Sequence, residues 1–140
     1  MKTYNVAVVG ATGMVGQRFL TLLNGHPWFK VKALAASARS AGKPYRQSVE
    51  GRWMMEGPIP AEAADLIVLD AQADAEKIAG MVDFILCAVD MKKEEIAKLE
   101  ERYAKLECPV VSNNSAHRHT PDVPMVLPEV NPEHLEIIAA

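Results

Sequence analysis

Three glycines at positions 10, 13 and 16 follow the apolar run Val6-Ala7-Val8-Val9 and precede a helical pattern. A tight turn between a strand and a helix needs backbone angles that residues with a Cβ resist, and glycine also lets an anion approach the main chain closely. The N-terminus of the helix then offers free N–H groups and about half a positive charge. This glycine turn therefore predicts a site for a dinucleotide pyrophosphate, although a plain tight turn would use the same residues. A Walker-type phosphate loop is excluded, because no Gly-Lys-Ser/Thr follows.

The segment Ser37-Ala38-Arg39-Ser40 stands at the end of the second apolar run. At this place an acidic residue binds the adenosine ribose of NAD, whereas an arginine accommodates the 2′-phosphate of NADP. No Asp or Glu occurs between residues 37 and 49. Arginine offers a planar fork of donors and the serines offer hydroxyl groups, so the segment predicts NADP rather than NAD. The alternative is that Arg39 is an ordinary solvated loop residue.

Short apolar runs alternate with helical patterns along the chain, as in a parallel sheet covered by helices. The sequence therefore predicts an α/β fold, a Rossmann-like doubly wound and mostly parallel sheet with helices on both faces. Asp90 is the expected N-cap of the clearest helix, and Asn24-Gly25 is expected to end the first helix with a left-handed glycine. Strands are expected at residues 5–9, 29–36, 66–69, 84–89 and 109–111, and helices at 15–23, 75–81 and 92–106.

Residues 41–60 contain three glycines and three prolines and show no clear periodicity. This composition predicts a loop with a short extra hairpin. Further on, Asn131-Pro132-Glu133 predicts the start of another helix, because each residue type is favoured at its position there. The sequence stops at residue 140, soon after this start, and we therefore expect it to be a fragment of a longer protein.

Composition and charge exclude several classes of protein. The 140 residues are 49% hydrophobic and 24% charged with a net charge of −3, which suits a single globular domain and argues against a nucleic-acid binder. The longest wholly apolar run, residues 84–89, is far shorter than the ~20 residues of a membrane helix. The two cysteines are expected to be buried thiols of a reducing compartment, so we predict a cytoplasmic location.

Several motifs together resemble the aspartate-semialdehyde dehydrogenase family, most closely its archaeal and fungal-type branch. The resemblance covers essentially the whole chain and is specific in combination, although each motif alone is not. It is carried by the segments at residues 10–19, 26–29, 37–40, 112–118 and 126–131, in the order expected of the family.

This resemblance implies the activity of the parent enzyme. The family reduces L-aspartyl 4-phosphate to L-aspartate 4-semialdehyde with NADPH and releases phosphate, an early step toward lysine, threonine and methionine. A cysteine thiolate attacks the acyl phosphate to form a thioester, and a histidine of a second domain serves as acid and base. The parent enzyme is expected to be a homodimer or homotetramer acting on a small-molecule substrate, with no nucleic-acid or membrane partner.

The resemblance also assigns roles to residues of this chain. It implies that the pyrophosphate of the cofactor is bound by Gly10, Thr12, Gly13, Met14 and Val15. The 2′-phosphate would be held by Ser37, Arg39 and Ser40, and the surface beneath the cofactor would be formed by Cys87 and Ala88. Asn114 and Asn131 would lie near the nicotinamide and the reacting centre, and Arg118 would bind the substrate phosphate.

The chemistry of an acyl phosphate supports Arg118 independently, because the guanidinium group can bind a phosphate through two hydrogen bonds. The alternative is that Arg118 is a loop arginine in a salt bridge. His117 and His119 flank it, but two histidines at this spacing without a carboxylate or thiolate partner make a poor zinc site, so no metal is expected.

No catalytic residue is expected within these 140 residues. The family's nucleophile lies in an Asn-Cys-Ser/Thr segment downstream of Pro-Glu-Val-Asn, and the sequence ends nine residues after Asn131 without reaching one. Neither Cys87 nor Cys108 stands in that context. We therefore expect this chain to bind cofactor without turning over substrate.

Three other functions are alternatives to the one that the resemblance implies. The first is the corresponding part of a related acyl reductase, such as a malonyl-CoA or N-acetylglutamyl-phosphate reductase, and the second is a complete non-catalytic nucleotide-binding module. The third, a short-chain dehydrogenase, would need Tyr-x-x-x-Lys. It fails, because Val8, Val49 and Glu107 stand four residues after the three tyrosines.

Overall fold

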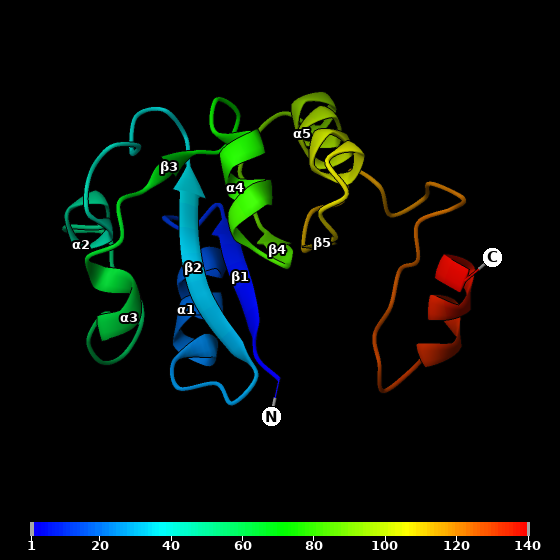
Figure 1. Ribbon diagram of the computed structural model, residues 1–140, viewed down its shortest axis with the longest axis horizontal. Coiled ribbons are helices and arrows are strands. Elements are labelled where there is room, and N and C mark those ends of the chain that lie inside the picture. Colours follow the sequence, from blue (N-terminus) through cyan, green and yellow to red (C-terminus); the bar gives the residue numbers. More distant parts are fainter. Residues whose placement is uncertain (1, 140) are drawn as a thin grey trace.

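The computed structural model describes residues 2–139, which form one five-stranded sheet with helices packed on it. All neighbouring strands are parallel, in the order β3-β2-β1-β4-β5 (Figure 1). The strands are β1 (Tyr4–Val9), β2 (Phe29–Ala36), β3 (Leu69–Asp70), β4 (Phe84–Cys87) and β5 (Val110–Ser112). The helices on the sheet include α1 (Met14–Leu23), α4 (Ala75–Met81) and α5 (Lys93–Lys105). The predicted doubly wound α/β fold is confirmed.

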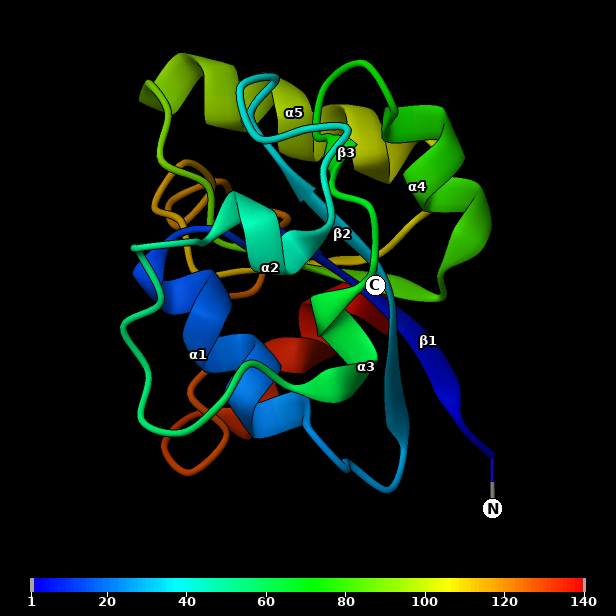
Figure 2. The same ribbon diagram turned by 90° about the vertical axis from the view of Figure 1, so that its left-hand side faces the viewer.

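Both faces of the sheet are covered, and side chains alternate between them along β1. Figure 2 shows α1 on one side of the strands and α4 and α5 on the other. Val8 packs with Leu20 and Leu34 in the core under α1. Ala7 and Val9 belong to the opposite core, under α4 and α5. Strands buried on both faces explain why the sequence shows continuous apolar runs rather than alternation.

Helix α5 begins later than the sequence predicts. Its N-cap is Lys92 in an extended conformation, with Glu94 and Glu95 in the first turn, so the prediction of Asp90 as N-cap is wrong. The chain leaves β4 at Cys87 and crosses the end of the sheet before it turns helical, which leaves Asp90 exposed in that crossing. At the end of α1, Gly25 has φ +70° as expected.

The region between β2 and β3 differs most from the prediction. It contains two single-turn helices, α2 (Tyr45–Ser48) and α3 (Ala61–Ala64), in place of the predicted hairpin. Residues 42–45 instead pair antiparallel with residues 66–68, through Gly42 N–H to Val68 O (2.8 Å) and Val68 N–H to Lys43 O (2.9 Å). Most of the strand predicted at 66–69 therefore pairs with residues 42–45, and only Leu69–Asp70 joins the sheet.

The segment after β5 extends away from the sheet, and Figure 1 shows it to one side of the other elements. The helix predicted after Asn131 is present as the 3₁₀ helix η1 (Pro132–Ala139). No residue from 109 to 138 is buried. None of the helices in residues 2–139 has the length and apolar character needed to cross a bilayer.

Candidate dinucleotide-binding site

Close packing requires two of the three glycines in the turn between β1 and α1. Gly10 has φ +88°, and a Cβ on it would stand 2.3 Å from Ala88 O at the end of β4. A Cβ on Gly16 would stand 2.2 Å from Gly10 O. These distances are far below van der Waals contact, so the turn can lie against β4, and α1 against the turn, only with glycine at both positions.

Gly13 is different, because nothing in the protein requires a glycine there. It is the N-cap of α1 with φ −79°, and a Cβ on it would meet its nearest neighbour, Gly10 O, at 3.7 Å. Its surface is exposed. A glycine that internal packing does not explain fits the close approach of a ligand to the backbone.

The start of α1 can accept an anion. Among residues 2–139 no hydrogen-bond acceptor takes the N–H groups of Thr12, Met14 or Val15. The first turn holds no acidic side chain and no side chain caps the helix. The free N–H groups and the positive end of the helix dipole therefore meet at the glycine turn.

A cavity of about 420 Å³ lies at the carboxyl ends of the strands, the edge to which the arrowhead of β2 points in Figure 1. Strand β1 lies between β2 and β4, so this is the place where the sheet order reverses and where ligands of such folds bind. The cavity brings together seven residues predicted to bind cofactor, which are Gly10, Thr12, Gly13, Ser37, Arg39, Ser40 and Ala88.

The cavity also contains residues that sequence reasoning missed. Arg52 lines it from the loop after α2, and Asp70 and Gln72 line it from the end of β3. Asp70 and Gln72 could have been found by placing β3 correctly, because Asp70 is its last residue and Gln72 lies two residues further on. Arg52 carries no signal of this kind, since it follows no strand and the hydrogen bond from Gln17 comes from 35 residues away.

Met14, Val15 and Cys87 do not line the cavity, but they lie beside it. Met14 and Val15 form the first turn of α1, with their side chains exposed. Cys87 ends β4 and is fully buried, and Asn114 Nδ2 donates a hydrogen bond to its Sγ at 3.4 Å. Burial, reinforced by the nearby carboxylate of Glu100, raises the pKa of the Cys87 thiol to about 12. Cys87 is therefore a protonated thiol at neutral pH, unsuited to nucleophilic attack.

Arg118 and Asn131 lie on the segment after β5 and do not line the cavity. Arg118 Nη2 donates to Asn113 O at 3.0 Å, and its side chain is exposed. Asn131 bridges its own loop, because its Oδ1 accepts from Leu127 N–H (2.8 Å) and its Nδ2 donates to Met125 O (2.8 Å). The roles expected of these two residues and of Asn114 stay predictions.

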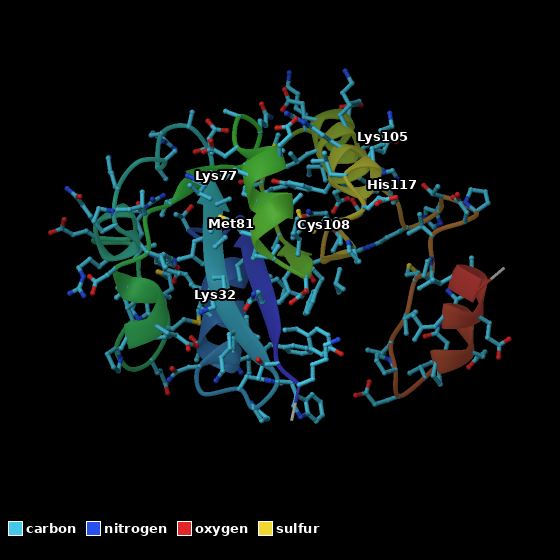
Figure 3. The ribbon with its side chains drawn as sticks, in the orientation of Figure 1. Lys32, Lys77, Met81, Lys105, Cys108 and His117 are labelled. Atoms are coloured by element: carbon cyan, nitrogen blue, oxygen red, sulfur yellow. The ribbon has the colours of Figure 1, made fainter. Side chains whose placement is uncertain are left out.

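His117 packs against α5, as Figure 3 shows, with its Nε2 3.4 Å from Ala97 O and 3.9 Å from Glu101 Oε1. Its Nδ1 lies 3.1 Å from Thr120 Oγ1. These contacts fix the ring to the protein and leave it no shared site with His119. Within the part of the chain that the structure describes, no three His, Cys, Asp or Glu side chains gather as a metal site would require.

Sequence comparison with known proteins finds aspartate-semialdehyde dehydrogenases as relatives of this chain. Aspartate-semialdehyde dehydrogenase of Methanothermobacter thermautotrophicus is 44% identical over 136 residues, which are 96% of this chain and 36% of that protein. The enzyme of Saccharomyces cerevisiae is 39% identical over 132 residues, 94% of this chain and 34% of that protein. The chain thus spans about a third of the length of these relatives.

Solved structures agree with the sequence relatives. The crystal structure of aspartate-semialdehyde dehydrogenase with NADP from Candida albicans matches 96% of this chain and 36% of that chain, with a TM-score of 0.86 and 35% identity. Aspartate-semialdehyde dehydrogenase II from Vibrio cholerae covers 98% of this chain and 36% of its own, with a TM-score of 0.70 and 29% identity. The family model described as semialdehyde dehydrogenase, NAD binding domain, matches residues 5–138. With this match over nearly its whole length, the chain belongs to the semialdehyde dehydrogenase family, in the part that forms the NAD-binding domain.

Proposed function

We propose that this chain binds NADP at the glycine turn and is the cofactor-binding part of an aspartate-semialdehyde dehydrogenase. The complete enzyme would reduce L-aspartyl 4-phosphate to L-aspartate 4-semialdehyde and release phosphate. The observation that carries the proposal is the cavity at the carboxyl ends of the strands, where Thr12 and the exposed Gly13, at the start of α1, share one space with Arg39.

The two ends of the cavity suit the two anionic groups of NADP. At one end the first turn of α1 would bind the pyrophosphate through the N–H groups of Thr12, Met14 and Val15. At the other end Ser37, Arg39 and Ser40 follow β2 and would hold the 2′-phosphate. The carboxylate of Asp70 also lines the cavity, but its Oδ1 accepts from the N–H groups of Gln72 and Ala73 at 2.9 Å each, which neutralises part of its charge.

NADPH would supply a hydride to the acyl group. Residues of this chain would orient the cofactor, with Cys87 and Ala88 beneath it and with Asn114 and Asn131 near the nicotinamide. Arg118 would bind the phosphate of the substrate. The nucleophile and the acid/base group would come from a longer polypeptide, because the buried Cys87 thiol cannot serve as one. The cytoplasmic location and the homodimer or homotetramer of the parent enzyme stay predictions.

Calorimetric titration of the 140-residue chain tests cofactor choice. NADP(H) should bind more tightly than NAD(H), and Arg39→Ala should weaken NADP binding while leaving NAD nearly unchanged. Arg46→Ala is the matched control, because Arg46 is paired with Asp65 at 2.8 Å and lies outside the cavity. Equal affinities for the two cofactors in the unmodified chain would defeat the assignment.

A second assay tests whether this chain binds cofactor without catalysing the reaction. The purified chain should not catalyse the phosphate-dependent oxidation of aspartate semialdehyde, because it lacks an exposed thiolate in the expected Asn-Cys-Ser/Thr context. Turnover by this chain alone would show that a residue within it acts as nucleophile.

A further inference from the structure

A second arginine lines the cavity beside Arg39. Arg52 comes from the loop after α2 and shares the cavity with Ser37 and Ser40. Neither Arg39 nor Arg52 is paired with a carboxylate among residues 2–139. Arg46, six residues before Arg52, instead forms an ion pair with Asp65 outside the cavity. The cavity therefore holds two guanidinium groups, and neither forms an ion pair with Asp70 or Asp90, the two acidic residues that also line it.

The buried amide of Gln17 holds the main chain at Arg52. Gln17 lies on α1 and is 1% exposed. Its Nε2 donates to Thr12 O in the glycine turn and to Arg52 O, both at 3.0 Å, and its Oε1 accepts from Met54 N–H at 2.8 Å. One side chain thus ties the glycine turn to the loop that carries Arg52.

Hydrogen bonds continue from Arg52 to the segment after β2. Arg52 N–H donates to Val49 O at 2.8 Å, and its Nη2 donates to Ser48 O. The hydroxyl of Ser48 in turn donates to Ser40 O at 3.1 Å. The glycine turn, Arg52 and the segment predicted to bind the 2′-phosphate therefore form one connected network.

The positive charge of Arg52 affects the pKa of the buried Tyr45. The buried Tyr45 hydroxyl donates to Ala11 O at 2.6 Å, and burial raises its pKa above the ordinary value, while the positive charge of Arg52 acts in the opposite direction. The guanidinium group of Arg52 has five donors, of which the bond to Ser48 O uses one, so the others remain for a ligand.

We propose that Arg52 is a second residue that selects the 2′-phosphate of NADP, and that Gln17 is the positioning residue that fixes it in place. The inference rests on the proposed function, since it names a further residue of the same cofactor site. A phosphate monoester carries nearly two negative charges, which one exposed arginine would neutralise only in part. Arg52 would supply the second cation, held in place before the cofactor arrives.

The test is calorimetric titration of the full chain with two pairs of ligands, NADP against NAD and adenosine 2′,5′-bisphosphate against 5′-AMP. Each pair differs by the 2′-phosphate alone. Arg52→Gln should weaken binding of NADP and of the bisphosphate at least about 10-fold, the loss expected for a charge-assisted hydrogen bond. It should leave NAD and 5′-AMP within about twofold. Arg46→Gln, the matched control, should change none of the four affinities.

Gln17→Leu tests the positioning role. It should lower the preference for NADP over NAD, and adding it to Arg52→Gln should not lower the preference further, because Gln17 would act through Arg52. Arg52 is exposed, so its variant remains informative even if Gln17→Leu does not fold.

Three results would overturn the inference. An equal loss of NADP and NAD in Arg52→Gln would place Arg52 at the pyrophosphate. Affinities that match those of Arg46→Gln would show that Arg52 binds no cofactor. An unmodified chain that binds no NADP would refute the proposed function itself, whereas the first two results would leave that function standing.

Discussion

The glycine turn and the segment after β5 are built in opposite ways. In the turn, the main chain bonds to β2, the side chain of Gln17 bonds to the loop at residues 52–54, and Gly10 packs against Ala88 after β4. At the start of the segment after β5, Asn113 and Asn114 bond to Cys87, and His117 contacts α5. Beyond residue 120, Asn131 bonds to its own loop, and apolar side chains such as Leu127 and Val130 are largely exposed.

This difference separates two parts of the proposed function. The cofactor cavity is formed by contacts within the sheet and its connections, so it should exist whenever the sheet folds. Asn131 is held by local bonds that set no position relative to the cavity, and the side chain of Arg118 bonds, among residues 2–139, only to Asn113 O, five residues before it. The stability of the chain and its affinity for cofactor should therefore depend on the first region and hardly at all on the second.

The largest expected effect is that of Gly10→Ala. A Cβ there would meet Ala88 O at 2.3 Å in a backbone conformation with φ +88°. Left-handed strain of about 1–2 kcal/mol and overpacking of about 1–3 kcal/mol predict a loss of about 2–5 kcal/mol in the free energy of unfolding. Urea unfolding followed by circular dichroism measures it.

Gly25→Ala is the control for this variant, because Gly25 also has positive φ (+70°) but no neighbour within 4 Å of a Cβ. It should lose only the strain of about 1–2 kcal/mol. Equal losses at the two positions would mean that the contact with Ala88 contributes nothing.

The next effect is on affinity rather than stability. Gly13→Ala should lower the free energy of unfolding by at most about 1 kcal/mol, because its Cβ meets no atom closer than 3.7 Å and only the N-cap preference for glycine over alanine is lost. It should weaken NADP binding about 10-fold or more, since the added methyl group stands where the pyrophosphate approaches the backbone. Calorimetric titration measures the loss, and unchanged affinity would remove Gly13 from the binding site.

The sequence predicts the sheet and the turn well because local patterns determine both. Strand β2 was predicted at its observed bounds, since its apolar run is buried on both faces. The region from 41 to 70 was predicted poorly, because the pairing of Gly42 with Val68 depends on contacts 26 positions apart in the sequence. Local propensity contains no information on such a pairing.

The same reasoning separates the site residues. Gly10 directly follows a predicted strand, and Gly13 and Arg39 lie within four residues of the end of one, so their common cavity could be predicted from topology. Arg52 could not, because the Gln17 amide reaches it from 35 residues away. The roles of Arg118 and Asn131 rest on family resemblance, which local bonding in this chain does not test.

The buried Cys87, which contacts Asn114 at the boundary of the two regions, gives a smaller effect that depends on pH. Its pKa is raised from 9.0 to about 12, so the folded state keeps the thiol protonated while the unfolded state releases the proton. The stability contributed by this group is complete below pH 9 and is lost as the pH rises toward 12. The loss is at most about 1.4 kcal/mol per pH unit.

Urea unfolding at pH 8, 9 and 10 measures this loss, and Cys87→Ala should show a shallower decline than the unmodified chain. Cys108 has a raised pKa too, from burial, so some decline should remain in the variant. Parallel pH profiles for the two proteins would mean that Cys87 is accessible to water in the folded state.

The smallest effect is expected in the segment after β5. Val130 is 70% exposed, so Val130→Ala removes almost no buried apolar surface and should change the free energy of unfolding by less than about 0.5 kcal/mol. Leu20→Ala, at a position 1% exposed under the sheet, should cost about 2–5 kcal/mol in the same urea experiment. A loss above about 1 kcal/mol for Val130→Ala would mean that this segment packs against the sheet in solution. The segment after β5 and the glycine turn would then differ only in how strongly they pack against the sheet, and Asn131 would have a fixed position relative to the cavity.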